Sequence, residues 1–148
     1  MASRYGLQIR AASSADAAGI VELMEAAGRA VPAATLAGRL DALRDEPGAA
    51  LLALEWGPPS GLIVLNWYRT LAADLPVAQI SMLLVGPDER RRGIGRMLLK
   101  AGSQAARNAG CGTLHLIAAG DESLAAFCRA TGFDEAGTGY ARPLRKRS

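Results

Sequence analysis

The fold of this chain is constrained most by one junction, at which an apolar run meets a turn rich in glycine and arginine. Residues 77–85 form the longest mostly apolar run of the sequence, interrupted only by Gln79 and Ser81, and Gly86-Pro87-Asp88 follows it at once. From Gly93 onward, apolar side chains recur at helical spacing. This order predicts a buried central strand, a tight turn and an amphipathic helix, a succession typical of α/β proteins.

The other segments predict strands and helices in alternation. Residues 49–56 and 62–68 are apolar runs separated by a Gly-Pro-Pro-Ser-Gly turn, which indicates an antiparallel hairpin. Further strands are expected at residues 5–10, 113–118, 133–135 and 140–143. Helices are expected after a capping box of Ser13 and Asp16, and at residues 32–46, 93–110 and 121–129.

Length and composition indicate one soluble domain over residues 1–148, with residues 142–148 as a basic flexible tail. The net charge of +3 is too small to imply a nucleic-acid partner by itself. No stretch approaches the ~20 apolar residues of a membrane span, and no signal sequence precedes the first strand. These absences predict a cytoplasmic protein, with no nucleic acid and no membrane among its partners.

The cysteine and histidine content limits the chemistry further. Cys111 and Cys128 are the only cysteines and are expected to be free thiols. Together with the single histidine, His115, they are too few to build a metal site, so no metal is expected.

Four arginines, Arg90, Arg91, Arg92 and Arg96, crowd around Gly93 and Gly95 at the start of the predicted helix. Free N–H groups and the helix dipole favour an anion at a helix N-terminus. Glycine lets the backbone approach a phosphate closely, and arginine side chains reach its oxygens. The segment therefore predicts a cradle for a phosphate-bearing ligand.

Other phosphate motifs fit this segment poorly, and one structural alternative stays open. A Walker A loop requires Lys and Ser or Thr after its second glycine, and the dinucleotide fingerprint requires a third glycine where Leu98 stands. The structural alternative is an exposed, arginine-rich turn that caps the helix.

The run Arg90-Arg91-Arg92-Gly93-Ile94-Gly95 resembles the R/Q-x-x-G-x-G/A signature of the GNAT superfamily, the acyl-CoA-dependent N-acetyltransferases. About 35 residues later, Phe127-Cys128-Arg129-Ala130-Thr131-Gly132-Phe133 is similar to the family's F-Y-x-x-x-G-F element. The resemblance covers nearly the whole chain. It implies an α/β fold with a mixed, mostly antiparallel sheet, splayed central strands and about four flanking helices.

The resemblance also implies how acetyl-CoA, the acyl donor, is bound. Arg90, Gly93 and Gly95 stand at the signature positions, and the backbone of residues 91–96, which includes Arg91, Arg92, Ile94 and Arg96, would hold the CoA pyrophosphate. Leu84 and Val85 would pair with the pantetheine arm, and the Leu84 N–H would polarise the thioester carbonyl. Asp121 stands where many members carry an Asn that contacts the cofactor arm, although a helix cap explains it as well.

The residues for proton transfer depart from the family pattern. Cys128 stands where many members carry the Tyr that protonates the leaving thiolate, and Tyr140 or water is the substitute acid. Gln79 stands where many members place Glu, and an amide is no base. Ser81 can position a water, and His115 is the other candidate base, although a His in that place is more often an ordinary strand residue.

The expected function is transfer of an acetyl group from acetyl-CoA to a primary amine, by direct attack in a ternary complex. A non-catalytic acyl-CoA-binding domain is the main alternative, and a basic nucleic-acid-binding module is a third. The acceptor is open among aminoglycosides, polyamines, amino acids and protein N-termini. Trp67, Tyr68 and Asp74 are candidates for its wall, Asp74 or Glu22 for attraction of a cationic amine, and the resemblance suggests a possible homodimer.

Overall fold

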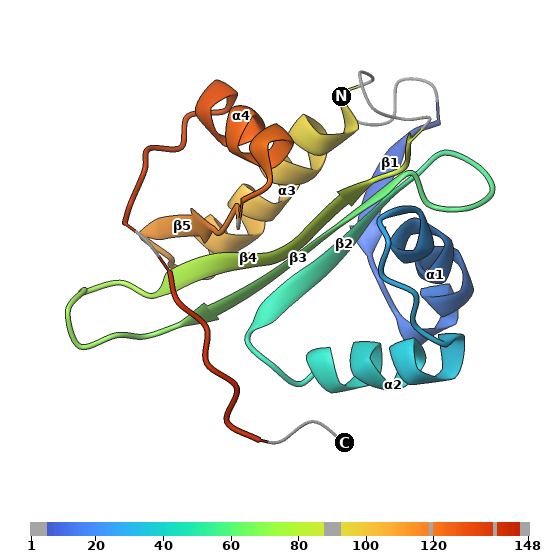
Figure 1. Ribbon diagram of the computed structural model, residues 1–148, viewed down its shortest axis with the longest axis horizontal. Helices are drawn as coiled ribbons and strands as arrows, with labels where there is room; N and C mark the ends of the chain where they lie inside the picture. Colours follow the sequence, from blue (N-terminus) through green and yellow to red (C-terminus); the bar gives the residue numbers. More distant parts are fainter. Residues whose placement is uncertain (1–5, 88–92, 119, 138, 146–148) are drawn as a thin grey trace. The chain divides into compact units, whose positions relative to one another are not determined.

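The computed structural model describes residues 6–87, 93–118, 120–137 and 139–145 (Figure 1). The chain forms two compact units, residues 1–115 and 116–148. The first unit holds nearly all of the sheet and its covering helices. The described residues of the second unit form one helix, followed by a C-terminal segment without helix or strand.

The sheet has five strands in the order in which they occur in the chain. They are β1 (Gln8–Ala11), β2 (Gly48–Leu54), β3 (Gly61–Tyr68), β4 (Val77–Val85) and β5 (Thr113–Leu116). The pairs from β1 to β4 are antiparallel. The Gly112 N–H donates to the Pro76 carbonyl at 2.9 Å, so β4 and β5 begin side by side and run parallel. The predicted fold class, a mixed and mostly antiparallel sheet flanked by helices, is confirmed.

A bulge in β4 decides which of its side chains face which helices. Val64 pairs with Met82 whereas Leu65 pairs with Ile80, so Ser81 is an extra residue on β4. An extra residue reverses the alternation of side chains along a strand. Gln79 before the bulge therefore shares a face with Met82 and Leu84 after it.

Helices cover both faces of the sheet (Figure 1). The short helix η1 (Ser14–Asp16), α1 (Ala17–Ala26) and α2 (Ala33–Leu43) lie on one face, where they bury an apolar core with β2 and β3. That core consists of Ala17, Ile20, Leu23, Met24, Leu36, Leu40, Leu52, Leu62 and Val64. The helix α3 (Ile94–Asn108) lies on the other face, against Ile63 and Leu65 of β3.

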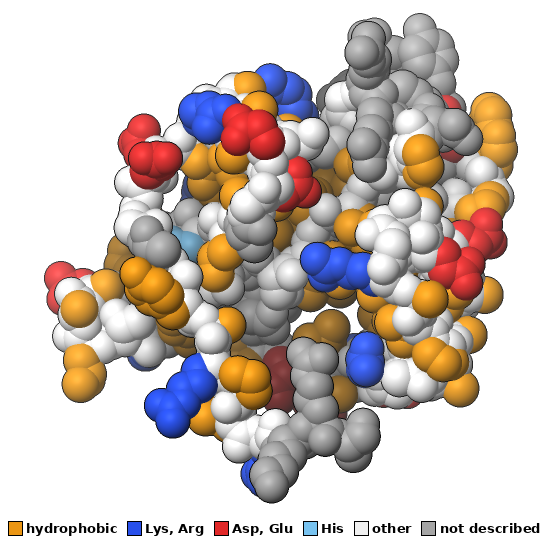
Figure 2. Space-filling model, viewed as in Figure 1, with side chains coloured by type: hydrophobic (Ala, Val, Ile, Leu, Met, Phe, Trp, Pro, Cys, Tyr) orange, Lys and Arg blue, Asp and Glu red, His pale blue; other side chains and the backbone are white. Residues whose placement is uncertain are grey.

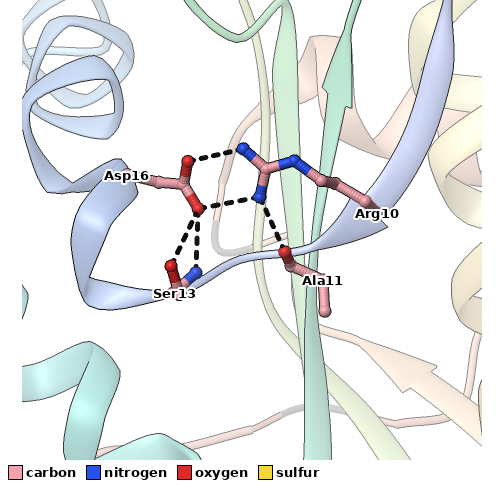
Figure 3. Close-up of polar contacts among 4 residues, drawn as sticks. All are labelled: Arg10, Ala11, Ser13 and Asp16. Carbon is pink, nitrogen blue, oxygen red and sulfur yellow. Dashed lines mark hydrogen bonds and ion pairs between the residues drawn. The ribbon is translucent and has the colours of Figure 1, made fainter.

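The turn from β1 into α1 is held by an ion pair (Figure 3). Arg10 donates to both carboxylate oxygens of Asp16, with N–O distances of 2.7 and 3.0 Å, and to the Ala11 carbonyl at 2.9 Å. The same carboxylate accepts the backbone N–H of Ser13 at 2.9 Å, which is the return bond of the predicted capping box. These bonds lower the pKa of Asp16, and the contact with Arg10 is the main cause.

The second unit differs from the sequence prediction. Its helix α4 (Glu122–Ala130) was expected, but residues 133–137 and 139–145 contain no strand. Gly132 and Gly137 adopt φ angles of 93° and 96°, which are not extended, and Pro143 has no N–H for a ladder. Tyr140 and Leu144 are 94% and 91% exposed, so neither supplies the buried face that a closing strand needs. The strands predicted at residues 133–135 and 140–143 were therefore wrong.

Candidate active site

At the end of β4, the backbone N–H and C=O groups of successive residues point alternately towards β3 and towards the opposite edge of the strand. The Gly86 N–H donates to the Ser60 carbonyl at 2.9 Å, and the Leu84 carbonyl oxygen lies 2.9 Å from the position a Cβ would take on Gly61. The Leu84 peptide groups therefore face β3. Because backbone groups alternate along a strand, the N–H groups of Leu83 and Val85 point to the opposite edge.

That opposite edge of β4 extends beyond its neighbour. β4 has nine residues and β5 has four, and the two strands begin together. The last residues of β4 therefore run past the end of β5. An edge with unpaired backbone groups accepts an extended ligand as an additional strand.

The N-terminus of α3 has the properties of an anion site. Gly93 adopts a left-handed conformation, with φ 78° and ψ 14°, and its carbonyl accepts the Met97 N–H at 3.0 Å. The first turn of this 15-residue helix contains no acidic residue. Ile94 is 1% exposed and anchors the helix in the core, whereas the Arg96 side chain is exposed. Arg90, Arg91 and Arg92 lie outside the described residues.

Gly61 of β3 brings the two parts of this site together. A Cβ on Gly61 would stand 2.8 Å from Leu98 Cδ1 and 3.1 Å from Ile94 Cγ2, in addition to its contact with the Leu84 carbonyl. The start of α3 therefore packs directly against the backbone beside the end of β4. Sequence reasoning missed Gly61, because a glycine after a turn predicts only the turn.

Four polar side chains form a cluster where β3 and β4 pair, which we call the strand-face cluster: Asn66, Tyr68, Gln79 and Ser81. Tyr68 Oη donates to Gln79 Oε1 at 3.4 Å, and Ser81 Oγ donates to Asn66 Oδ1 at 3.1 Å. None of the four side chains is a base near neutral pH. The four side chains of this cluster therefore supply no base of their own.

The loop that follows this cluster is exposed. Figure 2 shows hydrophobic side chains at the surface of the loop between β3 and β4, at the left of the view. Leu71 and Leu75 of this loop are 109% and 55% exposed. Asp74 is also exposed, and Trp67 is half-buried at the end of β3. Of the three predicted wall residues, only Tyr68 forms a side-chain bond with another residue of the described site.

In the second unit, Asp121 caps α4. Its Oδ1 accepts the Leu124 N–H at 3.0 Å, so the cap interpretation holds for this carboxylate. Cys128 is half-buried on the same helix, and burial raises the pKa of its thiol while Arg129 partly opposes that shift. The thiol is therefore protonated at neutral pH, as an acid must be.

The two remaining candidates for proton transfer are solvent-exposed. Tyr140 lies in the extended segment of the second unit. His115 is exposed while Leu114 and Leu116 are half-buried, which fits the predicted alternation along β5.

Comparison with known proteins identifies the family. The model of the acetyltransferase (GNAT) family matches residues 20–133, most of the chain and both units. The chain belongs to the GNAT family. No curated protein matches the sequence significantly.

Solved structures of GNAT proteins share this fold at low sequence identity. An acetyltransferase of Trypanosoma brucei is 22% identical, with a TM-score of 0.81 over 93% of this chain and 99% of that one. The aminoglycoside acetyltransferase meta-AAC0020, from an uncultured soil metagenomic sample, is 19% identical, with a TM-score of 0.77 over 97% and 99%. Glucosamine-6-phosphate N-acetyltransferase of Arabidopsis thaliana is 13% identical, with a TM-score of 0.80 over 94% and 99%. At these identities the likeness concerns the fold.

Two features are absent from the described residues. No helix among them is long and apolar enough to cross a membrane. No group of three or more His, Cys, Asp or Glu side chains in the same ranges is placed to hold a metal ion.

Proposed function

We propose that this GNAT protein transfers an acetyl group from acetyl-CoA to a primary amine, by direct attack in a ternary complex. One observation carries the proposal: the end of β4, with its outward-facing N–H groups, lies beside a helix that starts on a left-handed glycine and has no acid in its first turn. The first feature suits the pantetheine arm and the second suits the pyrophosphate.

The direction of the β4 backbone refines the role expected of Leu84. A thioester carbonyl requires an N–H donor on the open edge of β4, and the Leu84 carbonyl instead faces β3. Leu83 and Val85 are therefore the better candidates for the amide that stabilises the developing oxyanion, and for pairing with the pantetheine arm. The role of Leu84 would instead be structural, because its side chain packs against the apolar core beneath α1 and α2 and so holds the end of β4 in place.

The proton transfers follow from the available side chains. The attacking amine would lose its proton through a water held at the strand-face cluster, because Gln79 itself cannot accept a proton. Cys128, protonated at neutral pH, is the proposed donor to the CoA thiolate, with Tyr140 or water as substitutes. Asp121 would act on the cofactor only through the oxygen that does not cap α4.

Release of free thiol from acetyl-CoA in the presence of a panel of amines tests the proposal. Turnover above the rate of hydrolysis is expected with at least one amine. Arg96→Glu should raise the KM for acetyl-CoA about tenfold or more, because it places a negative charge beside the proposed pyrophosphate site. Arg107→Glu, at the other end of α3, is the matched control and should leave that KM unchanged. Thiol release that no amine accelerates would contradict catalysis.

A non-catalytic acyl-CoA-binding domain is the second candidate. Gln79 favours it, because its side-chain amide bonds with Tyr68 at the place where a carboxylate base would be expected. Binding of acetyl-CoA without acetylation of any amine is the outcome that this candidate predicts.

A further inference from the structure

A cavity of about 230 Å³ opens between α2 and the strands β2 and β3 of the first unit. Its walls are mostly alanine, leucine and valine side chains, and among the described residues that line it only Arg44 and Asn66 carry polar side chains. An apolar cavity of about 150 Å³ accepts benzene, so this cavity suits a ligand of about ten non-hydrogen atoms or fewer. It is smaller than the pockets of about 300 Å³ or more that hold drug-sized ligands.

Arg44 is available to bind a ligand in this cavity. It is the C-cap of α2, and the last carbonyls of that helix accept the backbone N–H groups of Arg44, Asp45 and Glu46. The guanidinium is therefore not needed as a cap. Arg44 forms no ion pair with any residue in the described ranges, and no carboxylate is among the residues that line the cavity.

Asn66 connects the cavity to the proposed reaction. It lines the cavity from β3, and its Oδ1 accepts the Ser81 hydroxyl of β4 at 3.1 Å. Asn66 also pairs with Gln79 across the two strands. Asn66 of the strand-face cluster and the Arg44 cation at the end of α2 therefore line the same cavity.

We propose that the cavity selects the acceptor, and that this acceptor is a small primary amine with an apolar body and an anionic distal group, a carboxylate or a phosphate. The inference rests on the proposed function and narrows it. Arg44 binds the anionic group, the apolar walls bind the carbon chain, and the amine lies at the strand-face cluster. Polyamines and aminoglycosides are poor acceptors, because their additional cations meet Arg44 and no lining carboxylate.

Three amines of equal chain length test the role of charge: 5-aminopentanoate, pentylamine and 1,5-diaminopentane. For acetylation, kcat/KM should fall in that order, by about tenfold or more between the anionic and the cationic amine, as expected for one charge-assisted contact. 4-Aminobutyl phosphate distinguishes a phosphate preference from a carboxylate preference. Equal rates for the three amines, or a preference for the diamine, would overturn the inference while acetyl transfer itself still stands.

Variants of α2 assign the preference to Arg44. Arg44→Ala should remove the advantage of 5-aminopentanoate over pentylamine through KM, and Arg44→Lys should restore part of it. Arg39→Ala, an exposed arginine on the same helix, is the matched control and should keep the full preference. Loss of the preference in both alanine variants, or in neither, would contradict a role for Arg44.

If no turnover is observed, saturation-transfer NMR can still measure whether the amines bind to the protein, and so tests the proposed acceptor cavity. Binding of 5-aminopentanoate to the wild-type protein, weakened in Arg44→Ala, supports the cavity whether or not acetyl-CoA reacts. Absence of binding by both anionic amines overturns the inference, whereas absence of acetyl-CoA binding in a parallel titration counts against the proposed function.

Discussion

The thiol of Cys128 is the side chain on which the proposed proton donation to CoA depends. Replacement by alanine should lower the acetyl-transfer rate on the order of a hundredfold, the usual contribution of a positioned acid, and leave acetyl-CoA affinity intact. Because burial raises the pKa of the thiol, the wild-type rate should hold through neutral pH and fall only at alkaline pH, above the ordinary thiol value of about 8.5. Single-turnover rates between pH 6 and 10 measure this. An alkaline limb that persists in Cys128→Ala would remove Cys128 from the mechanism.

The carboxylate of Asp16 contributes to stability rather than to chemistry. Its pKa is lowered in the folded chain, so its contribution is present above the unfolded pKa of about 3.9 and is lost as the pH falls through the folded value. Asp16→Asn keeps an acceptor for Ser13 but loses the charge that faces Arg10, and should cost about 1 kcal/mol at pH 7. Urea unfolding at pH 7 and pH 3 should show a smaller deficit at pH 3 than at pH 7. An equal deficit at both pH values would contradict the ion-pair explanation.

Two features of β4 could not be predicted from the sequence: its bulge and the direction of its backbone groups. The run at residues 77–85 predicts a strand well, but apolar residues stand on both of its faces, so the sequence has no clear alternation in which one extra residue could be recognised. The bulge at Ser81 and the direction of the Leu84 carbonyl therefore became visible only in the structure. The expectation that Leu84 donates to the thioester came from the family resemblance, and the direction of the backbone favours Leu83 or Val85 for that role in the proposal.

At the level of secondary-structure elements, the packing of α3 against β3 determines the geometry of the proposed donor site. Gly61→Ala places a methyl group 2.9 Å from the Leu84 carbonyl oxygen and 2.8 Å from Leu98, so the start of α3 must move away from the end of β4. We expect a loss of about 1–3 kcal/mol in stability and a clear loss of acetyl-CoA affinity. Chemical denaturation and calorimetry measure the two effects.

Gly102→Ala is the matched control on the same helix. Its methyl group would meet only the ends of the Ile63 and Leu65 side chains, at 3.0 Å, and alanine favours a helix by about 1 kcal/mol over glycine. Gly102 lies two turns beyond the N-terminus of α3, so acetyl-CoA affinity should stay unchanged. Equal losses of affinity in both variants would show that α3 packing acts through stability alone.

The prediction of helices and strands was correct where glycines and capping residues mark the ends of an element. It was wrong where tertiary packing determines whether a segment forms a strand. Gly93, Gly110 and Gly132 end or start helices as expected, and Asp121 caps α4. The two closing strands were predicted from short alternating segments, and such short segments have few apolar side chains to bury. Exposed Tyr140 and Leu144 show that these residues have no face to bury in the described structure.

For the whole chain, the family model and the solved structures establish the family and the fold. The proposed acceptor, in contrast, is inferred from a cavity that no sequence motif predicts. Arg44 and Asn66 are far apart in sequence and unremarkable there, so only the structure brings them to one cavity. The motif at residues 90–95 resembles the family's donor-binding signature, and the arrangement of β4 and α3 is a separate observation in support of the proposed donor site.

Titration calorimetry with acetyl-CoA tests the proposed donor site most directly. Saturable binding at one site per chain is expected, with Arg91→Glu/Arg92→Glu weakening the affinity about tenfold or more and Arg107→Glu leaving it unchanged. Absence of measurable binding to acetyl-CoA and to free CoA would contradict both the acetyltransferase and the acyl-CoA-binding candidate.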